Sequence, residues 1–224
     1  MQIEKETLFA VIPAYNEEKH IAEVIEKTKK YISAERIIVV DDGSKDATYN
    51  AALKTGVTAI RHIVNLGKGA ALKTGCDYAV KKGACEIIAL DSDLQHNPAE
   101  IPNFTKALKE ADMVFGYRTP DKRMPLVLKF GNWFIGTAIK TLFRISIKDT
   151  QCGYRAFTKE TYEKIRWTAS DYSVESEMIA LVGKNKLRYR QIPIETIYVD
   201  KYKGTTPLDG ISIVMKMLWW RLTR

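Results

Sequence analysis

Two aspartates separated by one residue, Asp91 and Asp93, directly follow an apolar run at residues 86–90. If that run is a strand, residues i and i+2 beyond its end project to the same side, so both carboxylates can converge on one divalent cation. Oxygen ligands favour Mg²⁺ or Mn²⁺ over zinc. Such an ion would neutralise a diphosphate leaving group as the bond to it breaks. The alternative is a solvated acidic loop before Pro98.

Polar side chains also follow other short β-branched runs. Tyr15 and Glu17 follow the first run, Asp42 the second and Arg118 the fifth, while Lys68 follows a glycine-rich turn. Ligands of open α/β sheets bind beyond the carboxyl ends of strands, so these positions indicate a site for a base, a ribose and a metal-bound diphosphate. Each residue also has an ordinary explanation, since Glu17 suits the first turn of a helix, Asp42 suits a turn and Lys68 suits a solvated helix start.

The elements that must position these residues can be read from hydrophobic periodicity. Strands are predicted at residues 8–12, 36–40, 57–60, 86–90 and 112–115. Helices are predicted at residues 17–31, 46–55, 68–82 and 98–110. Near-continuous apolar strands separated by helices indicate a parallel sheet covered on both faces. Beyond Arg118 we expect a smaller α/β part, with helices at 172–184 and 209–222 and strands at 187–192 and 195–199.

The chain has 224 residues, a formal net charge of +8 and 46% hydrophobic residues, which indicates one globular domain over residues 1–224. Residues 1–117 contain 15 Lys and Arg against 17 Asp and Glu, whereas residues 118–224 contain 20 against 10. The basic half is therefore expected to attract an anionic partner. Its Lys and Arg residues match no RNA- or DNA-binding pattern, so no nucleic acid is expected.

The remaining features concern the compartment and the membrane. Three scattered cysteines without C-x-x-C spacing support neither a zinc site nor a disulfide framework, and the first residues do not resemble a signal peptide, so a reduced compartment is expected. The most apolar stretch, residues 124–147, is interrupted by three basic residues and is not expected to span a bilayer. This stretch and the helix that carries Trp219 and Trp220 can either lie on a bilayer surface or pack in the core.

Six motifs in order over roughly residues 8–204 together resemble the family 2 glycosyltransferases, and most of all the dolichyl-phosphate mannose synthase type. The motifs are V-I-P-A-Y-N-E (11–17), V-D-D-G-S (40–44), N-L-G-K-G-A (65–70), D-S-D-L-Q-H (91–96), G-Y-R (116–118) and D-T-Q-C-G-Y-R (149–155). The resemblance implies a GT-A fold of the α/β class, with a Rossmann-like, mostly parallel sheet flanked by helices and a smaller C-terminal acceptor lobe. It also implies a nucleotide-sugar donor such as GDP-mannose or UDP-glucose, Mg²⁺ or Mn²⁺, and transfer of a hexose with inversion.

The resemblance assigns roles to particular positions. Residues 1–117 would form the nucleotide-sugar-binding half, and residues 118–224 the acceptor and membrane-facing half. The donor is expected to contact Pro13, Tyr15, Glu17, Asp42, Lys68, Asp91 and Ser92. The metal ligands are expected to be Asp91, Asp93 and Gln95. The acceptor is expected to contact Arg118, Lys129, Arg155 and Lys203, the last because Pro207 stands where many relatives have a lysine. Catalysis is expected to depend on Asp91, Asp93 and Arg118.

The leading hypothesis is transfer of a hexose to a polyprenyl (dolichyl) phosphate by a protein bound peripherally to the cytoplasmic face of a membrane, with a separate membrane-anchoring subunit as a further candidate partner. A phosphate acceptor is already ionised at neutral pH and needs no strong general base. A second hypothesis is transfer to a sugar hydroxyl, which Glu175 or Glu177 would deprotonate. A third is an inactive nucleotide-sugar-binding partner protein, against which the intact Asp91 and Asp93 argue.

Overall fold

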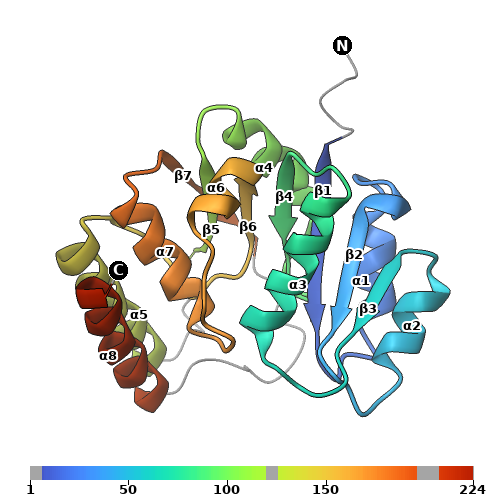
Figure 1. Cartoon of the computed structure of the whole chain (residues 1–224), viewed down its shortest axis with the longest axis horizontal. Coiled ribbons are helices and arrows are strands. Elements are labelled where there is room, and N and C mark those ends of the chain that lie inside the picture. The colour runs from blue at the N-terminus through green and yellow to red at the C-terminus, as the bar shows by residue number, and fades with distance from the viewer. Residues whose placement is uncertain (1–6, 120–125, 196–206, 224) are drawn as a thin grey trace.

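The computed structural model describes residues 7–119, 126–195 and 207–223. Within them, seven strands form one sheet in the order β3-β2-β1-β4-β6-β5-β7 (Figure 1). The strands are β1 (Leu8–Ala14), β2 (Ile37–Asp41), β3 (Thr58–Arg61), β4 (Glu86–Ala89), β5 (Met113–Arg118), β6 (Arg155–Thr158) and β7 (Tyr189–Ile194). The helices are α1 (Ile21–Thr28), α2 (Thr48–Lys54), α3 (Lys68–Lys81), α4 (Ile101–Leu108), α5 (Leu126–Phe143), α6 (Lys159–Lys164), α7 (Val174–Lys184) and α8 (Pro207–Thr223).

The sheet is mostly parallel, as predicted, with one exception. Strands β3, β2, β1 and β4 run parallel to one another, and β7 runs parallel to β5. Strand β6 lies between β4 and β5 and is antiparallel to both. The sequence analysis did not predict β6, which begins at the last residue of the D-T-Q-C-G-Y-R motif. This strand joins the two parallel groups into one sheet.

The two faces of the sheet carry separate hydrophobic cores. One face packs against α3, α5, α6, α7 and α8, and the other against α1, α2 and α4. Strand β1 contributes to both, since Phe9 and Val11 point to the first core while Ala10 and Ile12 point to the second. All seven residues of β1 are buried. A strand covered on both faces needs apolar residues at every position, which explains its unbroken apolar sequence.

Helices α5 and α8 pack against each other at the opposite end of the molecule from α2 (Figure 1). Each buries one face, through Ile135 and Ile139 of α5 and Met217 and Trp220 of α8. Their other faces carry large exposed apolar side chains, which are Trp133, Phe134, Met215, Leu218 and Trp219. No helix in the described ranges is long and apolar enough to cross a membrane. The alternatives of core packing and surface exposure therefore apply to different faces of the same two helices.

Most of the predicted elements are present, with shifted ends. The helix predicted at 17–31 begins at Ile21, and the one predicted at 98–110 consists of a 3₁₀ turn followed by α4. Helices α5 and α6 were not predicted as helices. Of the strand predicted at 195–199, residue Glu195 is not in a strand and the rest lies outside the described residues.

The packing of α3 on the sheet yields a prediction about Gly75. A Cβ atom at Gly75 would lie inside van der Waals contact of Val11 Cγ1 and 3.1 Å from Val40 Cγ2. Because overpacking a core forces backbone shifts, we expect Gly75→Ala to lower the free energy of unfolding by about 1–3 kcal/mol, measured by urea denaturation. The matched control is Gly131→Ala in α5, where no described atom outside the adjoining residues and the helix's own backbone lies within 4 Å of the added Cβ. Equal free energies of unfolding for the two variants would contradict the packing argument.

Candidate active site

The strand ends that carry polar residues meet at one edge of the sheet. Strand β6 begins at Arg155, which pairs with Ala89 of β4 and Phe115 of β5. Because β6 is antiparallel to both neighbours, its amino end lies where they have their carboxyl ends. The preceding segment, residues 149–154, is thereby brought to the residues that follow β4 and to Arg118 at the end of β5. The D-T-Q-C-G-Y-R motif thus lies at the centre of the site.

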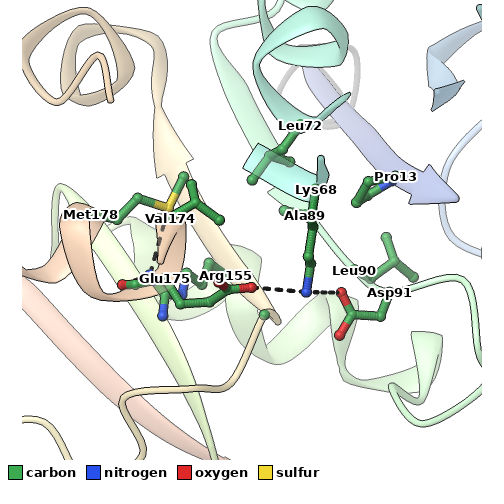
Figure 2. A pocket seen from close by; sticks show the side chains of 11 residues that line it. Pro13, Lys68, Leu72, Ala89, Leu90, Asp91, Arg155, Val174, Glu175 and Met178 are labelled. Atoms are coloured by element: carbon green, nitrogen blue, oxygen red, sulfur yellow. Dashed lines mark hydrogen bonds and ion pairs between the residues drawn. The ribbon is translucent and has the colours of Figure 1, made fainter. Parts of the chain in front are cut away.

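A buried lysine joins three of the elements at this edge. Lys68, the first residue of α3, places its Nζ 2.7 Å from Oδ1 of Asp91 and 2.8 Å from Oε1 of Glu175 (Figure 2). Burial alone would lower the pKa of Lys68, but the two carboxylates raise it above its ordinary value. Burial would raise the pKa of Asp91, but Lys68 holds it well below the ordinary value. Lys68 and Asp91 are therefore both charged at neutral pH.

Gly153 closes over this ion pair. A Cβ atom at Gly153 would lie 2.8 Å from Oδ1 of Asp91 and 2.9 Å from Nζ of Lys68. The position therefore admits only glycine without displacing one of the two charged groups. The exposed ring of Tyr172 lies on another side of the pair, with its centre 5.9 Å from Nζ of Lys68.

His96 orients Asp91 and is not itself charged. Its Nδ1 accepts a hydrogen bond from the backbone N–H of Asp91 at 3.0 Å, and its Nε2 lies 3.7 Å from Oδ2 of Asp91. Burial lowers the pKa of His96 to about 4, so the ring is neutral at pH 7 with its proton on Nε2. The thiol of Cys152 lies 4.0 Å from Nε2, but burial raises its pKa to about 12. Cys152 is therefore no nucleophile, despite its place beside a histidine.

The carboxylates at this edge suit a hard cation. Burial and the neighbouring Asp91 raise the pKa of Asp93, and Glu17 adds to the effect, so a positive ion there would relieve their repulsion. Asp93 accepts a hydrogen bond from the backbone of Gln95 at 3.1 Å. The described residues contain no group of three His, Cys, Asp or Glu side chains that could hold a metal. A cation bound by these residues would need further oxygen ligands, which water and a diphosphate supply in many Mg²⁺ sites.

Asp42 shapes the loop that leads to Lys68. Its Oδ1 lies 2.7 Å from Nδ1 of His62 and accepts from the backbone of Leu66 at 3.0 Å, while its Oδ2 accepts from the backbone of Gly67 at 2.7 Å. The predicted contact of Asp42 with the nucleoside stays a prediction. The adjacent Asp41 is also buried, and its Oδ2 has no hydrogen-bond partner among the described residues, although it lies 3.1 Å from Nε of Arg61.

The other predicted donor residues line the same edge. Pro13, near the end of β1, belongs to the pocket drawn in Figure 2 together with Lys68 and Asp91. Tyr15 is 41% exposed, and Ser92 is buried. The buried Glu17 places Oε2 2.9 Å from Nδ1 of His20. Their roles in donor binding stay predictions.

The predicted acceptor residues are in different situations. Arg118 donates from Nε to Oδ2 of Asp149 at 2.7 Å and from a terminal nitrogen to Oδ1 at 3.0 Å. Burial would raise the pKa of Asp149, but its hydrogen bonds with Arg118 hold it below its ordinary value. Lys129 lies on α5 with its side chain outside the described part of the structure, and Lys203 lies outside the described residues.

Arg155 is buried beneath the site rather than exposed at it. Its guanidinium donates to the backbone oxygens of Cys152 at 2.9 Å, Glu175 at 2.6 Å and Thr150 at 3.3 Å, and it lies over the ring of Phe115. These bonds join the start of β6 to the start of α7. The structure supports a role in holding these elements together, and a contact with the acceptor stays a prediction.

Several residues of the site were missed or used differently by sequence reasoning. Asp149 and Gly153 belong to a motif from which only Arg155 was singled out, and His96 was noted only as following the aspartates. Glu175 was considered only as a base for a hydroxyl acceptor. The D-T-Q-C-G-Y-R motif was the pattern that could have identified Asp149 and Gly153 as site residues. The pairing of Glu175 with Lys68 joins positions 107 apart in the sequence, so no local pattern could reveal it.

Comparison with known proteins identifies the family. Residues 9–166 match the model described as Glycosyl transferase family 2. The chain belongs to this family. Its glycosyltransferase membership and the predicted resemblance to enzymes of the dolichyl-phosphate mannose synthase type are thus confirmed.

Relatives of this glycosyltransferase align over nearly its whole length. An uncharacterized protein of Methanocaldococcus jannaschii is 37% identical, covering 99% of this chain and 95% of the relative. The UDP-N-acetylglucosamine–dolichyl-phosphate N-acetylglucosaminyltransferase of Methanococcus voltae is 32% identical, covering 96% of each chain. The polyprenol monophosphomannose synthase of Mycolicibacterium smegmatis is 27% identical, covering 91% of this chain and 81% of the relative.

Solved structures confirm the predicted GT-A fold. Glucosyl-3-phosphoglycerate synthase from Mycobacterium tuberculosis in complex with UDP superposes with a TM-score of 0.74 at 19% identity, covering 97% of this glycosyltransferase and 81% of that chain. The same synthase in complex with Mn²⁺, UDP and glucosyl-3-phosphoglycerate gives a TM-score of 0.69 at 21% identity, with 96% and 79% covered. At these identities the likeness concerns the fold alone.

The fit of Gly153 over the ion pair predicts a loss of activity without a loss of fold. In Gly153→Ala the added methyl group must displace the end of the Asp91 or the Lys68 side chain, and neither change moves the backbone. We expect the melting temperature to change by only a few degrees and the rate of glycosyl transfer to fall by about tenfold or more, because misplaced groups cost rate steeply. Wild-type activity in this variant would refute the argument.

The position of Arg155 predicts a loss of stability. Arg155→Met leaves three backbone oxygens without their donor, so we expect the free energy of unfolding to fall by about 3 kcal/mol in urea denaturation. The matched control is Arg190→Met, because Arg190 forms an exposed pair with Glu110 and its loss should cost about 1 kcal/mol or less. The prediction is wrong if both variants are equally stable.

Proposed function

We propose that this glycosyltransferase moves a sugar from a nucleotide-sugar donor to a polyprenyl phosphate at a membrane surface, with Mg²⁺ or Mn²⁺ bound. The observation that carries the acceptor class is the full-length similarity to the Methanococcus voltae relative, whose name states a dolichyl-phosphate acceptor. The Mycolicibacterium smegmatis relative, named for polyprenol monophosphomannose, supports the same acceptor class. The neighbours bound to UDP and Mn²⁺ or Mg²⁺ support the donor class and the metal.

The donor end of the reaction is assigned to the edge of β4. Asp91, Asp93 and Gln95 would hold the divalent cation, which neutralises the diphosphate as it leaves. Lys68 is the one lysine of the described residues that is ion-paired inside this site, and its long side chain can also reach the diphosphate. Asp42 supports the reaction indirectly, by fixing the loop from which Lys68 projects.

The acceptor end is assigned to Arg118. The two hydrogen bonds that Arg118 donates to Asp149 fix the plane of its guanidinium, and a guanidinium of fixed orientation is suited to binding a phosphate. The phosphate oxygen would attack the anomeric carbon as the bond from that carbon to the diphosphate breaks. Attack from the face opposite the diphosphate inverts the configuration. The acceptor loses no proton in this step, since it is ionised at neutral pH.

Transfer to a sugar hydroxyl is the weaker alternative. It requires a general base, and the sequence offers Glu175 and Glu177 on α7. The carboxylate of Glu177 accepts hydrogen bonds from the backbone of Thr168 and Ala169, at distances from 2.7 to 3.2 Å, and is buried. Glu175 is paired with Lys68. In the structure, both carboxylates are therefore engaged by other groups of the protein.

The proposed reaction is tested by transfer of labelled sugar from UDP-N-acetylglucosamine, UDP-glucose and GDP-mannose to a short polyprenyl phosphate. We expect label in the lipid with one donor and loss of that label in EDTA. Asp93→Asn should lower kcat/KM by about a hundredfold or more, and Arg118→Lys by at least about tenfold, because lysine lacks the planar fork. The control Arg190→Lys should behave as wild type. Metal-dependent hydrolysis of the donor without a lipid product would contradict the polyprenyl-phosphate acceptor and favour transfer to a sugar hydroxyl.

Binding to the membrane is assigned to the exposed face of α5 and α8. Trp133 is 62% exposed and Trp219 is 65% exposed, and aromatic side chains favour the interface between water and lipid. We expect Trp219→Ser to reduce co-sedimentation with vesicles that contain anionic lipid. The control is Leu53→Ser, because Leu53 is 51% exposed on α2 at the far end of the molecule (Figure 1). Equal losses in the two variants would contradict this assignment.

A further inference from the structure

We infer that Glu175 binds a hydroxyl group of the transferred sugar, in the place that the Lys68 ammonium occupies here. The inference rests on the proposed function, since it needs a nucleotide-sugar donor in this site. Glu175 is buried and does not lie on the protein surface. It lies at the start of α7, across Lys68 from Asp91, in the pocket shown in Figure 2.

An unsatisfied atom is the first observation. Glu175 is 5% exposed, and its Oε2 has no hydrogen-bond partner among the described residues. A buried carboxylate oxygen without a donor is costly, and such atoms are rare in folded proteins outside functional sites. The other oxygen, Oε1, pairs with the ammonium at the end of the Lys68 side chain, which can move. Glu175 therefore has capacity to accept hydrogen bonds from a ligand.

The second observation is the geometry of the two carboxylates around Lys68. Its Nζ lies 2.7 Å from Asp91 and 2.8 Å from Glu175, and these are also the usual separations of a hydroxyl oxygen from its acceptor. The gap between the carboxylates is thus the size of one hydrogen-bond donor group. A hydroxyl group can fill it as the ammonium does.

The position of the gap indicates which hydroxyl-bearing group enters it. Asp91 follows β4 beside Asp93, where the proposed function places the metal and the diphosphate, and the sugar is attached directly to that diphosphate. Leu72, Val174 and Met178 form the apolar lining of the pocket, which keeps water from competing for the carboxylates. When a donor binds, Lys68 exchanges the carboxylates for the diphosphate, and the sugar takes its place.

The test combines a substitution with changes in the sugar. Wild type and Glu175→Gln are compared for kcat/KM with whichever of UDP-N-acetylglucosamine, UDP-glucose or GDP-mannose serves as donor, and with its monodeoxy analogues. For one hydroxyl position, we expect its removal to cost wild type roughly ten- to hundredfold and the variant threefold or less, because the charged acceptor is already lost.

The matched control is Glu177→Gln, the same change two residues further along α7. Its carboxylate holds the backbone at residues 168–169, so this variant should lose stability but keep the wild-type pattern of losses among the analogues. Identical patterns in wild type and Glu175→Gln would overturn the inference while lipid transfer by wild type still upheld the proposed function. If the wild-type protein uses no nucleotide sugar, the proposed function and this inference are both wrong. Melting curves confirm that each variant is folded.

Discussion

The buried contact of one ammonium with two carboxylates is the interaction on which the site depends. Lys68 opens α3, Asp91 follows β4 and Glu175 opens α7, so their meeting fixes the relative positions of three elements from both halves of the chain. Removing Lys68 would leave two carboxylates without a counter-charge inside the protein, which is far more costly than losing a surface pair. Gly153 and the neutral ring of His96 are best understood as the surroundings that this contact requires.

The antiparallel strand β6 is what makes that contact geometrically accessible. Parallel strands alone would bring only their carboxyl ends to the site, whereas β6 adds the segment that precedes it. Asp149 then reaches Arg118, and Gly153 reaches the ion pair, from a single short stretch of chain. The buried Arg155 holds the stretch in place from below. Donor-side and acceptor-side groups are therefore positioned by the same six or seven residues.

The sequence was sufficient to predict the family, the parallel sheet and the strand ends at which most candidate site residues lie, because a strand and the polar residues that follow it are local features of the sequence. It was insufficient where a role depends on contacts between distant segments. Arg155 belongs to a motif, and only its burial, its position over the Phe115 ring and its bonds to backbone oxygens indicate a structural role. Helix α5 was missed because its apolar residues face both a core and the solvent, which obscures the helical period. Asp42 also accepts hydrogen bonds from the loop before Lys68, through residues more than 20 positions away, and no local pattern could reveal these bonds.

The order of the strands also bears on how such a protein can be divided or recombined. Strands β4 and β5 do not pair with each other, since β6 lies between them. A fragment that ends at Tyr117 would leave β5 without either neighbour, because β7 also comes later in the chain. The nearly neutral half and the basic half are therefore not separable building blocks. A chimaera that exchanges acceptor preference between two relatives must carry β6 across in a form that still fits the β4 and β5 of its host.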